Sequence, residues 1–243
     1  MMRADIVAQH VAWGAMHEER SERCHRCHIR EMALCSSLCD SELASLRAIG
    51  RRKIVPKGAV ISWEGDDNGM CANIVSGALK LLKSTSDGRE QAVGLLFEGD
   101  FVGQPFSSTS ELTAVALSDT DICQYPRGQF ERVLTEQPKL ERALLERTMR
   151  SLNEARDRQL TLARKGARAR IAGFLVDLSR DGALTDIELP MSRGDIADYL
   201  GLTIETVSRQ FTDLRAKGLI DAEKGGRRVK LINLAGLQSL SDE

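Results

Sequence analysis

Residues 190–217 read PMSRGDIADYLGLTIETVSRQFTDLRAK, and this stretch decides how the whole chain is interpreted. Ser192 is placed to cap a first helix that ends at Leu200, and Gly201 supplies a sharp turn. Thr203 is placed to cap a second helix. The apolar positions that would pack the two helices together are Ile196, Leu200, Leu202, Val207, Phe211 and Leu214. Two short helices around one tight turn predict a helix-turn-helix, the alternative being an ordinary helical hairpin.

The second helix carries three polar side chains on its early exposed face, namely Glu205, Ser208 and Arg209. In a DNA major groove, arginine can donate two hydrogen bonds to guanine, glutamate can accept from cytosine, and serine is adaptable. We therefore expect these three residues to read bases. Glu205 and Arg209 are also spaced for an ion pair within the helix, and the two roles are compatible.

A basic hairpin wing follows, with β-type runs at 219–222 and 229–232 on either side of a turn at 223–228. Residues 206–230 hold seven basic and three acidic side chains, a net charge of +4 in a chain whose net charge is −1. That overall charge excludes a globally basic coat, so the local patch predicts a phosphate-contacting surface. The expected phosphate contacts are Ser192, Arg193, Thr203, Lys224, Arg227 and Arg228.

Upstream, residues 54–125 alternate short β-rich runs with glycine turns at 64–66, 76–77, 87–88 and 98–100. Turn signals at this interval predict an antiparallel barrel or sandwich. A short helix capped by Asp40 or Ser41 and ending at Ile49 is expected before it.

Pro138 begins a long helical stretch in which six mostly apolar positions follow one another at spacings of 3, 4, 3, 4 and 3. These spacings are typical of a two-stranded coiled coil, and we expect a homodimer seam. The seam residues are Leu145, Thr148, Leu152, Ala155, Gln159 and Leu162. The alternative is a helix packed on its own barrel.

Four of the six cysteines lie within sixteen residues, and three of these are Cys24, Cys27 and Cys35. A C-x2-C pair lets two thiolates reach one metal centre, and the surrounding arginines and histidines favour the thiolate form. Three cysteines and a distant fourth suit an iron–sulfur cluster. Zinc would accept four cysteines, or three with His25 or His28. A reduced terminus without metal is the third possibility.

Other functional classes find little support in these 243 residues. No apolar run is long enough for a transmembrane helix, and the N-terminus lacks a secretory signal, so we expect a cytoplasmic protein. Aromatic residues make up only 4% of the chain, which argues against single-strand binding by stacking. No His-Glu-x-x-His motif, Pro-Cys-x-x-Cys motif or phosphate-binding glycine loop is present, so we expect no enzymatic activity.

The order of these segments resembles the CRP–FNR family of bacterial transcription regulators over essentially the whole chain. Residues 191–209 resemble the FNR and FixK branch, whose reading residues form the Glu-x-x-Ser-Arg pattern found at 205–209. The resemblance implies an α+β fold with a β-roll like a cyclic-nucleotide-binding jelly roll, a long dimerisation helix and a winged helix-turn-helix. The expected divisions are a cysteine-rich cluster-binding segment at 1–39, the roll at 40–130, the helix at 131–163 and the DNA-binding domain at 164–243.

The resemblance also implies an oxygen-responsive regulator, because FNR-type sensors hold a [4Fe–4S] cluster with three N-terminal cysteines and one from the roll. Cys24, Cys27 and Cys35 match the first three, and Cys123, shortly before the step Tyr125-Pro126, matches the fourth. Cys39 and Cys71 have no counterpart, although Cys39 is close enough in sequence to be a rival ligand.

The partners implied are double-stranded DNA with an inverted pair of TTGAT half-sites, a second copy of the chain at low oxygen, and RNA polymerase. No cyclic nucleotide is expected, because residues 99–104 and 111–113 lack the glutamate and arginine of the nucleotide-binding members. The alternative within the family is a FixK-like regulator without a cluster, controlled by thiol oxidation or holding structural zinc.

Overall fold

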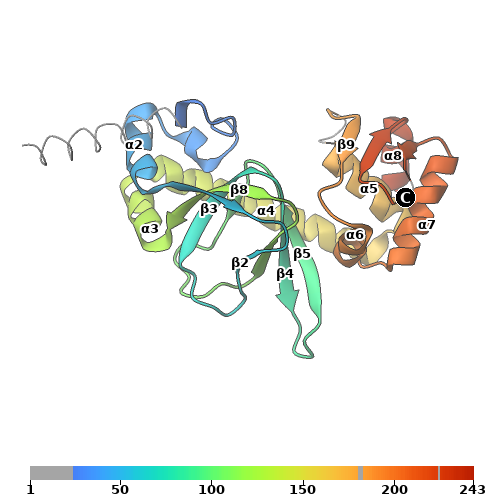
Figure 1. Cartoon of the computed structure of the whole chain (residues 1–243), viewed down its shortest axis with the longest axis horizontal. Helices are drawn as coiled ribbons and strands as arrows, with labels where there is room; N and C mark the ends of the chain where they lie inside the picture. The colour runs from blue at the N-terminus through green and yellow to red at the C-terminus, as the bar shows by residue number, and fades with distance from the viewer. Residues whose placement is uncertain (1–23, 180–182, 224) are drawn as a thin grey trace, which may run out of the picture.

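A β-roll lies at the centre of the molecule, and a long helix runs behind it toward a separate C-terminal domain (Figure 1). The computed structural model describes residues 24–179, 183–223 and 225–243. Residues 1–23 of the expected cysteine-rich segment, and Lys224 among the expected phosphate contacts, lie outside these ranges.

The roll consists of two four-stranded antiparallel sheets, with strand orders β1-β8-β3-β6 and β2-β7-β4-β5. Its strands are β1 (Arg51–Val55), β2 (Val60–Ser62), β3 (Met70–Ser76), β4 (Leu79–Ser84), β5 (Glu90–Leu96), β6 (Phe101–Val102), β7 (Thr113–Ala116) and β8 (Thr120–Pro126). Side chains such as Ile74, Leu79 and Ile122 fill the space between the sheets. The prediction of an antiparallel β-structure with glycine turns is confirmed, whereas β1 begins before the expected boundary at Ile54.

The cysteine-rich segment packs on one end of the roll through the 3-10 helix η1 (Leu34–Ser37) and α2 (Asp40–Ile49). The expected cap of α2 is wrong by one residue: Cys39 precedes the helix, and its backbone N–H donates to the Glu42 carboxylate at 2.9 Å. Ile29, Leu34 and Leu46 are buried in this packing, so the segment from 24 to 49 shares a core with the roll.

Two helices follow β8 directly, α3 (Arg127–Glu136) and α4 (Pro138–Arg164). Pro138 occupies the first position of α4, where its missing N–H costs no hydrogen bond, as the sequence predicts. The expected boundary between residues 130 and 131 falls inside α3, because helical structure begins as soon as the last roll strand ends. Leu140 is fully buried against the cysteine-rich segment, whereas most of α4 beyond it is exposed.

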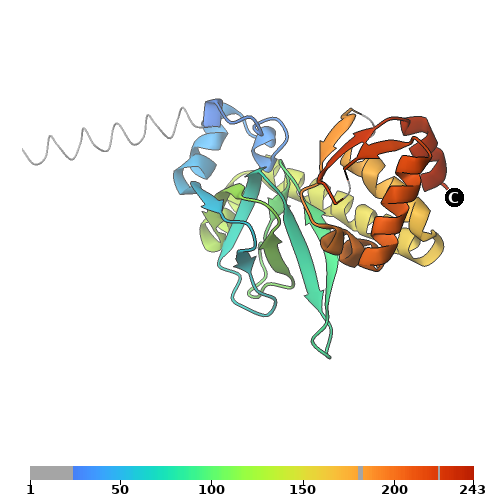
Figure 2. The same cartoon turned by 45° about the vertical axis from the view of Figure 1, so that its right-hand side comes forward.

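The C-terminal domain is a winged helix-turn-helix, which Figure 2 shows beside the roll. Its elements are α5 (Ala167–Leu178), β9 (Asp186–Glu188), α6 (Arg193–Leu200), α7 (Ile204–Ala216), β10 (Ile220–Ala222), β11 (Arg228–Leu231) and α8 (Leu234–Ser241). The expected caps are confirmed: Ser192 Oγ accepts from the Asp195 N–H at 3.1 Å, and Thr203 Oγ1 from the Thr206 N–H at 3.2 Å. Gly201 has a φ of 62°, which the tight turn requires. β9 and α8 were not expected.

Candidate functional site

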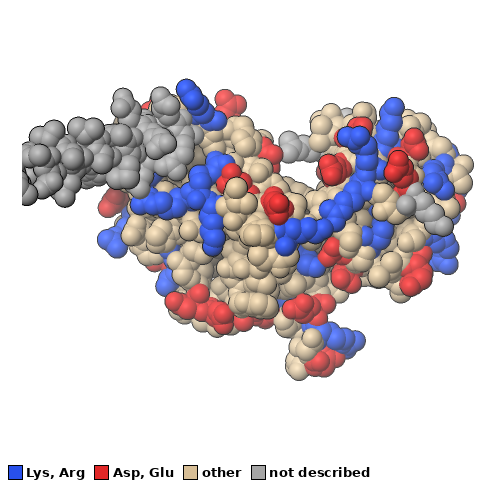
Figure 3. All heavy atoms as spheres, viewed as in Figure 1, with Lys and Arg blue, Asp and Glu red and all other residues tan. Residues whose placement is uncertain are grey.

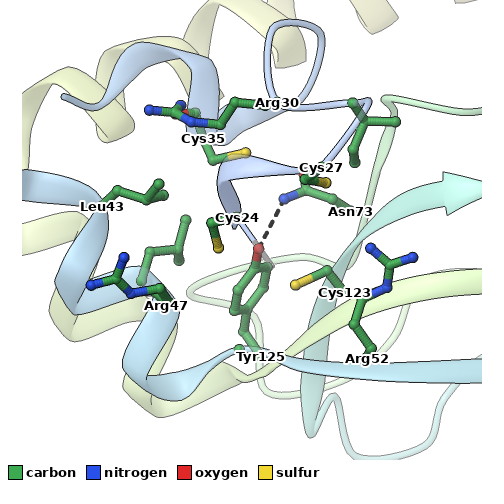
Figure 4. A pocket seen from close by; sticks show the side chains of 13 residues that line it. Cys24, Cys27, Arg30, Cys35, Leu43, Arg47, Arg52, Asn73, Cys123 and Tyr125 are labelled. Carbon is green, nitrogen blue, oxygen red and sulfur yellow. Dashed lines mark hydrogen bonds between the residues drawn. The ribbon is translucent and has the colours of Figure 1, made fainter. Parts of the chain in front are cut away.

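The side chains of four cysteines line one pocket at the end of the roll (Figure 4). Cys24, Cys27 and Cys35 come from the cysteine-rich segment, whereas Cys123 comes from β8, about ninety residues later in the chain. The other residues around the pocket are Ile29, Arg30, Leu43, Leu46, Arg47, Gly50, Arg52, Asn73 and Tyr125. The structure therefore brings the predicted ligand set together in one place.

Local hydrogen bonds hold the loop that carries Cys35. The Arg30 guanidinium donates to the backbone oxygens of Cys35 and Leu38, the latter at 2.8 Å. Gly50 leaves room for the ring of Tyr125, because a Cβ there would lie 3.1 Å from Tyr125 Cε1, with Cys123 Sγ 3.4 Å away. The pocket is thus shaped by the turn before β1 as well as by the cysteine loop.

Burial dominates the acidity of two of the pocket thiols. It raises the pKa of Cys35 to about 11, although the nearby Arg30 lowers that pKa, and it also raises the pKa of Cys123. The expectation that basic neighbours favour the thiolate in the cysteine-rich segment is wrong for Cys35, because loss of water outweighs the positive charge of Arg30. A bound metal would reverse this balance, since a coordinating thiol is deprotonated by the metal's own charge.

The spacing of the donors bears on which group they could hold. Within the described ranges, no three His, Cys, Asp or Glu side chains meet closely enough to ligate a single metal ion. A tetrahedral zinc site with bonds of about 2.3 Å needs its sulfurs roughly 3.8 Å apart. A [4Fe–4S] cluster takes each thiolate on a different iron, so its four sulfurs stand further apart. Four thiols lining one pocket are the donor set that such a cluster takes.

The remaining thiols and the two described histidines, His25 and His28, do not line the pocket. Cys39 is exposed at the start of α2, and Cys71 is fully buried in β3, where burial raises its pKa to about 12. His28 Nε2 lies 2.9 Å from the Val75 oxygen and 3.2 Å from the Glu98 carboxylate. A site made of three cysteines and His28 is therefore not what this geometry presents.

A second candidate site lies on the recognition helix α7. Glu205, Ser208 and Arg209 are all exposed on it, as expected for base-reading side chains. In this part of the chain, which the structure describes fully up to residue 223, the ion pair considered between Glu205 and Arg209 is not formed. Figure 3 shows basic and acidic side chains interspersed over the face that it views, so positive charge is local rather than a general coat.

The expected phosphate contacts occupy different surroundings. Arg227 and Arg228 are exposed at the wing, whereas the hydroxyls of Ser192 and Thr203 already serve as helix caps. The Arg193 guanidinium lies 3.4 Å from the centre of the Phe211 ring and donates to the Gly226 oxygen at 3.3 Å. Burial lowers the pKa of Arg193 to about 10. Its side chain thus links α6 to the recognition helix and the wing.

Comparison with known proteins gives the same architecture. Residues 169–240 match the Crp-like helix-turn-helix domain, and residues 52–137 match the cyclic nucleotide-binding domain. The nitrogen fixation regulation protein FixK of Bradyrhizobium diazoefficiens is 38% identical, over 93% of this chain and 97% of the relative. The transcriptional activator protein FnrL of Cereibacter sphaeroides is also 38% identical, over 88% and 90%. The chain belongs to the CRP–FNR family.

A solved structure of this family extends the match to three dimensions. The structure of FixK2 from Bradyrhizobium japonicum aligns with a TM-score of 0.73 and 33% identity, over 79% of this chain and 97% of that one. The CRP–FNR fold expected from the sequence is confirmed, and the chain is a DNA-binding transcription regulator. FixK and FnrL are equally similar to it, so the comparisons identify the family and not its signal.

None of the described residues that line the cavity inside the roll of this CRP–FNR protein is charged. Its polar side chains are those of Ser62, Asn68, Gln104, Ser110 and Ser151, and the rest are apolar residues or glycine. A cyclic phosphate bound there would find no lysine or arginine.

The predicted dimer seam lies on the outside of α4. Leu145 and Leu152 are 60% and 42% exposed, and Thr148, Ala155 and Gln159 are exposed as well. Leu162 differs, because it is half-buried and its Cδ2 lies 3.6 Å from where a Cβ on Gly201 would be.

No helix of the described residues has the length and apolar character needed to cross a membrane.

Three residues of these sites were not identified as functional from the sequence. Asn73 and Tyr125 face the cysteine pocket, and Arg147 joins α4 to the cysteine-rich segment. Asn73 and Cys123 are directly paired across β3 and β8, a register that no local pattern specifies. The only usable signal was the period of β8, which places Tyr125 on the same face as Cys123.

Proposed function

We propose that this CRP–FNR regulator senses oxygen through a [4Fe–4S] cluster held by Cys24, Cys27, Cys35 and Cys123. At low oxygen the protein binds, as a homodimer, an inverted pair of TTGAT half-sites. The observation that carries the proposal is that these four thiols, from segments distant in the sequence, line a single pocket. When bound, the cluster supplies an oxygen-labile tie between the cysteine-rich segment and β8.

The same segment is connected to α4 by apolar packing. Ile29, Leu34 and Leu38 share one core with Leu140 and with the partly buried Leu144. Displacement of the cysteine loop would therefore expose apolar surface on the first two turns of α4. Exposed apolar surface costs about 25 cal/mol per Å². Even a small movement of the loop away from α4 would therefore change the free energy of packing between them by kilocalories per mole.

Arg147 adds a polar connection one turn further along α4. One of its guanidinium nitrogens donates to the Gly99 oxygen at 2.6 Å, and the other donates to the Met32 oxygen. Gly99 has a φ of 90°, and a Cβ there would lie 3.1 Å from Met32 Cβ. The side chain thus clamps the cysteine loop and the β5–β6 turn to the dimerisation helix, and this clamp carries the state of the pocket to the seam.

The exposed apolar face of α4 supports dimerisation. Leu145, Met149, Leu152 and Leu160 are all large apolar residues that one chain leaves exposed. Pairing with the α4 of a second copy would bury the expected seam, and the polar Thr148 and Gln159 within it would keep the association moderate. A moderate association is what a switch requires, because a gap of a few kcal/mol can be reversed by one ligand.

The other partners follow from the family and the roll. RNA polymerase would contact surface loops of the roll and of the C-terminal domain. A cyclic nucleotide is not the signal, and the uncharged lining of the roll cavity supports this part of the proposal. Lys224, Arg227 and Arg228 would contact phosphates, while Glu205, Ser208 and Arg209 read bases.

Anaerobic purification of the full chain tests the proposal. We expect a brown protein with about four iron and four sulfide per chain, and tighter binding to a TTGAT palindrome than to a scrambled duplex. Exposure to air should remove the colour, the dimer and the DNA preference together. Cys39→Ser is the matched control and should behave like the wild type.

Two results would contradict the proposal. A colourless protein with stoichiometric zinc would favour the FixK-like alternative with a structural metal. A metal-free protein whose DNA binding follows thiol oxidation would favour the alternative controlled by thiols.

A further inference from the structure

The cysteine pocket contains a buried polar pair that is not part of the expected ligand set. Asn73 and Tyr125 are only 1% and 3% exposed, and they lie on the neighbouring strands β3 and β8. Asn73 Nδ2 donates to the Tyr125 hydroxyl oxygen at 3.1 Å, as the dashed line in Figure 4 marks. Both side chains point into the space that the four thiols surround.

The hydrogen-bonding capacity of this pair is not used up within it. The Tyr125 hydroxyl accepts from Asn73, which leaves its own O–H to donate elsewhere. The Asn73 Oδ1 atom is buried and has no hydrogen-bond partner among the residues that the structure describes. The side-chain amide of Asn73 could also be turned over, which exchanges its nitrogen and oxygen. In either orientation, the pair keeps N–H or O–H groups for which neither of its two side chains provides an acceptor.

The sulfur nearest to this pair along the sheet is that of Cys123, which lines the same pocket. The Tyr125 hydroxyl acts on that thiol, because it lowers the Cys123 pKa against the rise that burial causes. Successive side chains alternate along a strand, so the two residues share one face of β8. Asn73 lies directly opposite Cys123 in the register, and its amide donates to the tyrosine hydroxyl. The three side chains therefore lie together on one face of the sheet, with the Tyr125 hydroxyl between Asn73 and the predicted ligand from the roll.

Leaving a buried amide oxygen unsatisfied destabilises a fold, and a leucine at position 73 would avoid that cost. The polar pair therefore serves the pocket and not the core of the roll. Reduction potentials of iron–sulfur clusters depend on hydrogen bonds to their sulfurs and on exposure to solvent. A donor to a ligand sulfur withdraws electron density from it and makes loss of an electron less favourable.

We propose that Tyr125, oriented by Asn73, donates a hydrogen bond to Cys123 Sγ in the cluster-loaded protein and thereby sets the resistance of the cluster to oxidation. This inference rests on the proposed function, since it assigns a role to residues around that same site. Tyr125 and Asn73 are positioning residues, because they act through Cys123 and do not bind iron themselves.

Tyr125→Phe in the full chain, purified anaerobically, tests the inference. The variant keeps the ring and removes only the hydroxyl. We expect the oxidised-to-reduced ratio at a fixed potential to rise about fivefold, which is about 40 mV at 59 mV per tenfold for one electron. Loss of the visible absorption in air-saturated buffer should also become faster. Tyr199→Phe makes the same chemical change in the C-terminal domain and should leave both readouts unchanged.

Asn73→Leu, alone and combined with Tyr125→Phe, shows whether the two residues act in series. The single change should lower the potential by less than Tyr125→Phe does, and it should have no further effect in the double variant. Additive effects of the two changes would overturn the assignment of Asn73 as the residue that orients the tyrosine.

A measurement on the wild type covers the case in which Tyr125→Phe fails to assemble the cluster. Transfer to D2O should shift the iron–sulfur stretching bands in resonance Raman spectra, because the donor proton is exchangeable. Unshifted bands, or an unchanged potential in a brown Tyr125→Phe protein, would overturn this inference and leave the proposed function standing. A colourless wild type would overturn both.

Discussion

Arg147→Met should uncouple dimerisation through α4 from the occupancy of the cysteine pocket. Methionine retains an unbranched apolar stem along the surface of α4 and removes every donor. The change abolishes the hydrogen bonds to the Gly99 and Met32 oxygens, one on the roll and one on the cysteine loop. It touches none of the four pocket cysteines and none of the expected seam residues.

The size of the effect follows from those two contacts. A hydrogen bond from a charged donor contributes about 1.5–3 kcal/mol, and the Arg147 side chain is only 22% exposed, so screening by water is limited. Two bonds at the lower value give about 3 kcal/mol of coupling between the cysteine loop and α4. If between half and all of it reaches the seam, the dissociation constant of the anaerobic dimer rises about 10- to 100-fold.

Sedimentation of the anaerobic protein measures the dimer, and iron analysis of the same sample measures the cluster. Arg142→Met is the matched control, because it removes the same charge from a residue whose ion pair, to Glu146 at 3.0 Å, stays within α4. An Arg147→Met protein with full iron content and wild-type dimerisation would refute the coupling. Equal loss of iron and dimer would also refute it, since the residue would then be needed to build the pocket.

The other predictions concern the ligands, the reader and the seam. Cys123→Ser should abolish cluster assembly while Cys71→Ser retains about four iron per chain, and an essential Cys71 would show that the fourth ligand is misassigned. Arg209→Ala should remove the preference for TTGAT over scrambled DNA, at a cost of about 1–3 kcal/mol in binding free energy. Arg227→Ala should instead weaken binding to all sequences and reduce the slope of log binding constant against log salt concentration by about one. Leu152→Glu places like charges at the centre of the seam and should yield an iron-loaded monomer with weak DNA binding, so a stable dimer in that variant would exclude α4 as the interface.

The parts of this fold that the sequence predicts are those with local causes. Ser192 and Thr203 each cap their helix through the residue three positions later, and Gly201 satisfies a backbone requirement of its own. The turns of the roll are similarly marked by glycines with positive φ. By contrast, β9 is three residues long and is defined only by pairing with β11, so no periodicity could reveal it.

The site divides in the same way. The cysteine spacing identifies three candidate ligands, and the resemblance to a family adds Cys123. Their acidity could not be predicted, because the arginines near Cys35 are visible in the sequence while the burial that outweighs them is a property of the folded chain. Arg193 illustrates the same limit: a basic residue at the start of α6 suggests a phosphate contact, yet its guanidinium is stacked on Phe211.

The arginines of α4 explain how one helix can serve both the sensor and the reader. Arg147 and Arg158 are eleven residues apart, which is about three helical turns, so they lie on one face. Arg147 contacts the cysteine loop, whereas Arg158 donates to the Val93 oxygen on β5 and lies 4.5 Å from the centre of the Tyr199 ring on α6.

Two further contacts hold α6 of the DNA-binding domain to the roll near Arg158. Lys80 on β4 pairs with Asp195 of α6 at 2.6 Å, and the Gln91 side chain donates to the Asp198 oxygen. The expected seam lies on a neighbouring face, about 100° around the helix from the two arginines. A small rotation of α4 caused at the cysteine loop would therefore move the seam and the contact with α6 together. Under the proposed function, dimerisation and the placement of the recognition helix would respond to one signal, because a single helix contacts both the cysteine loop and α6.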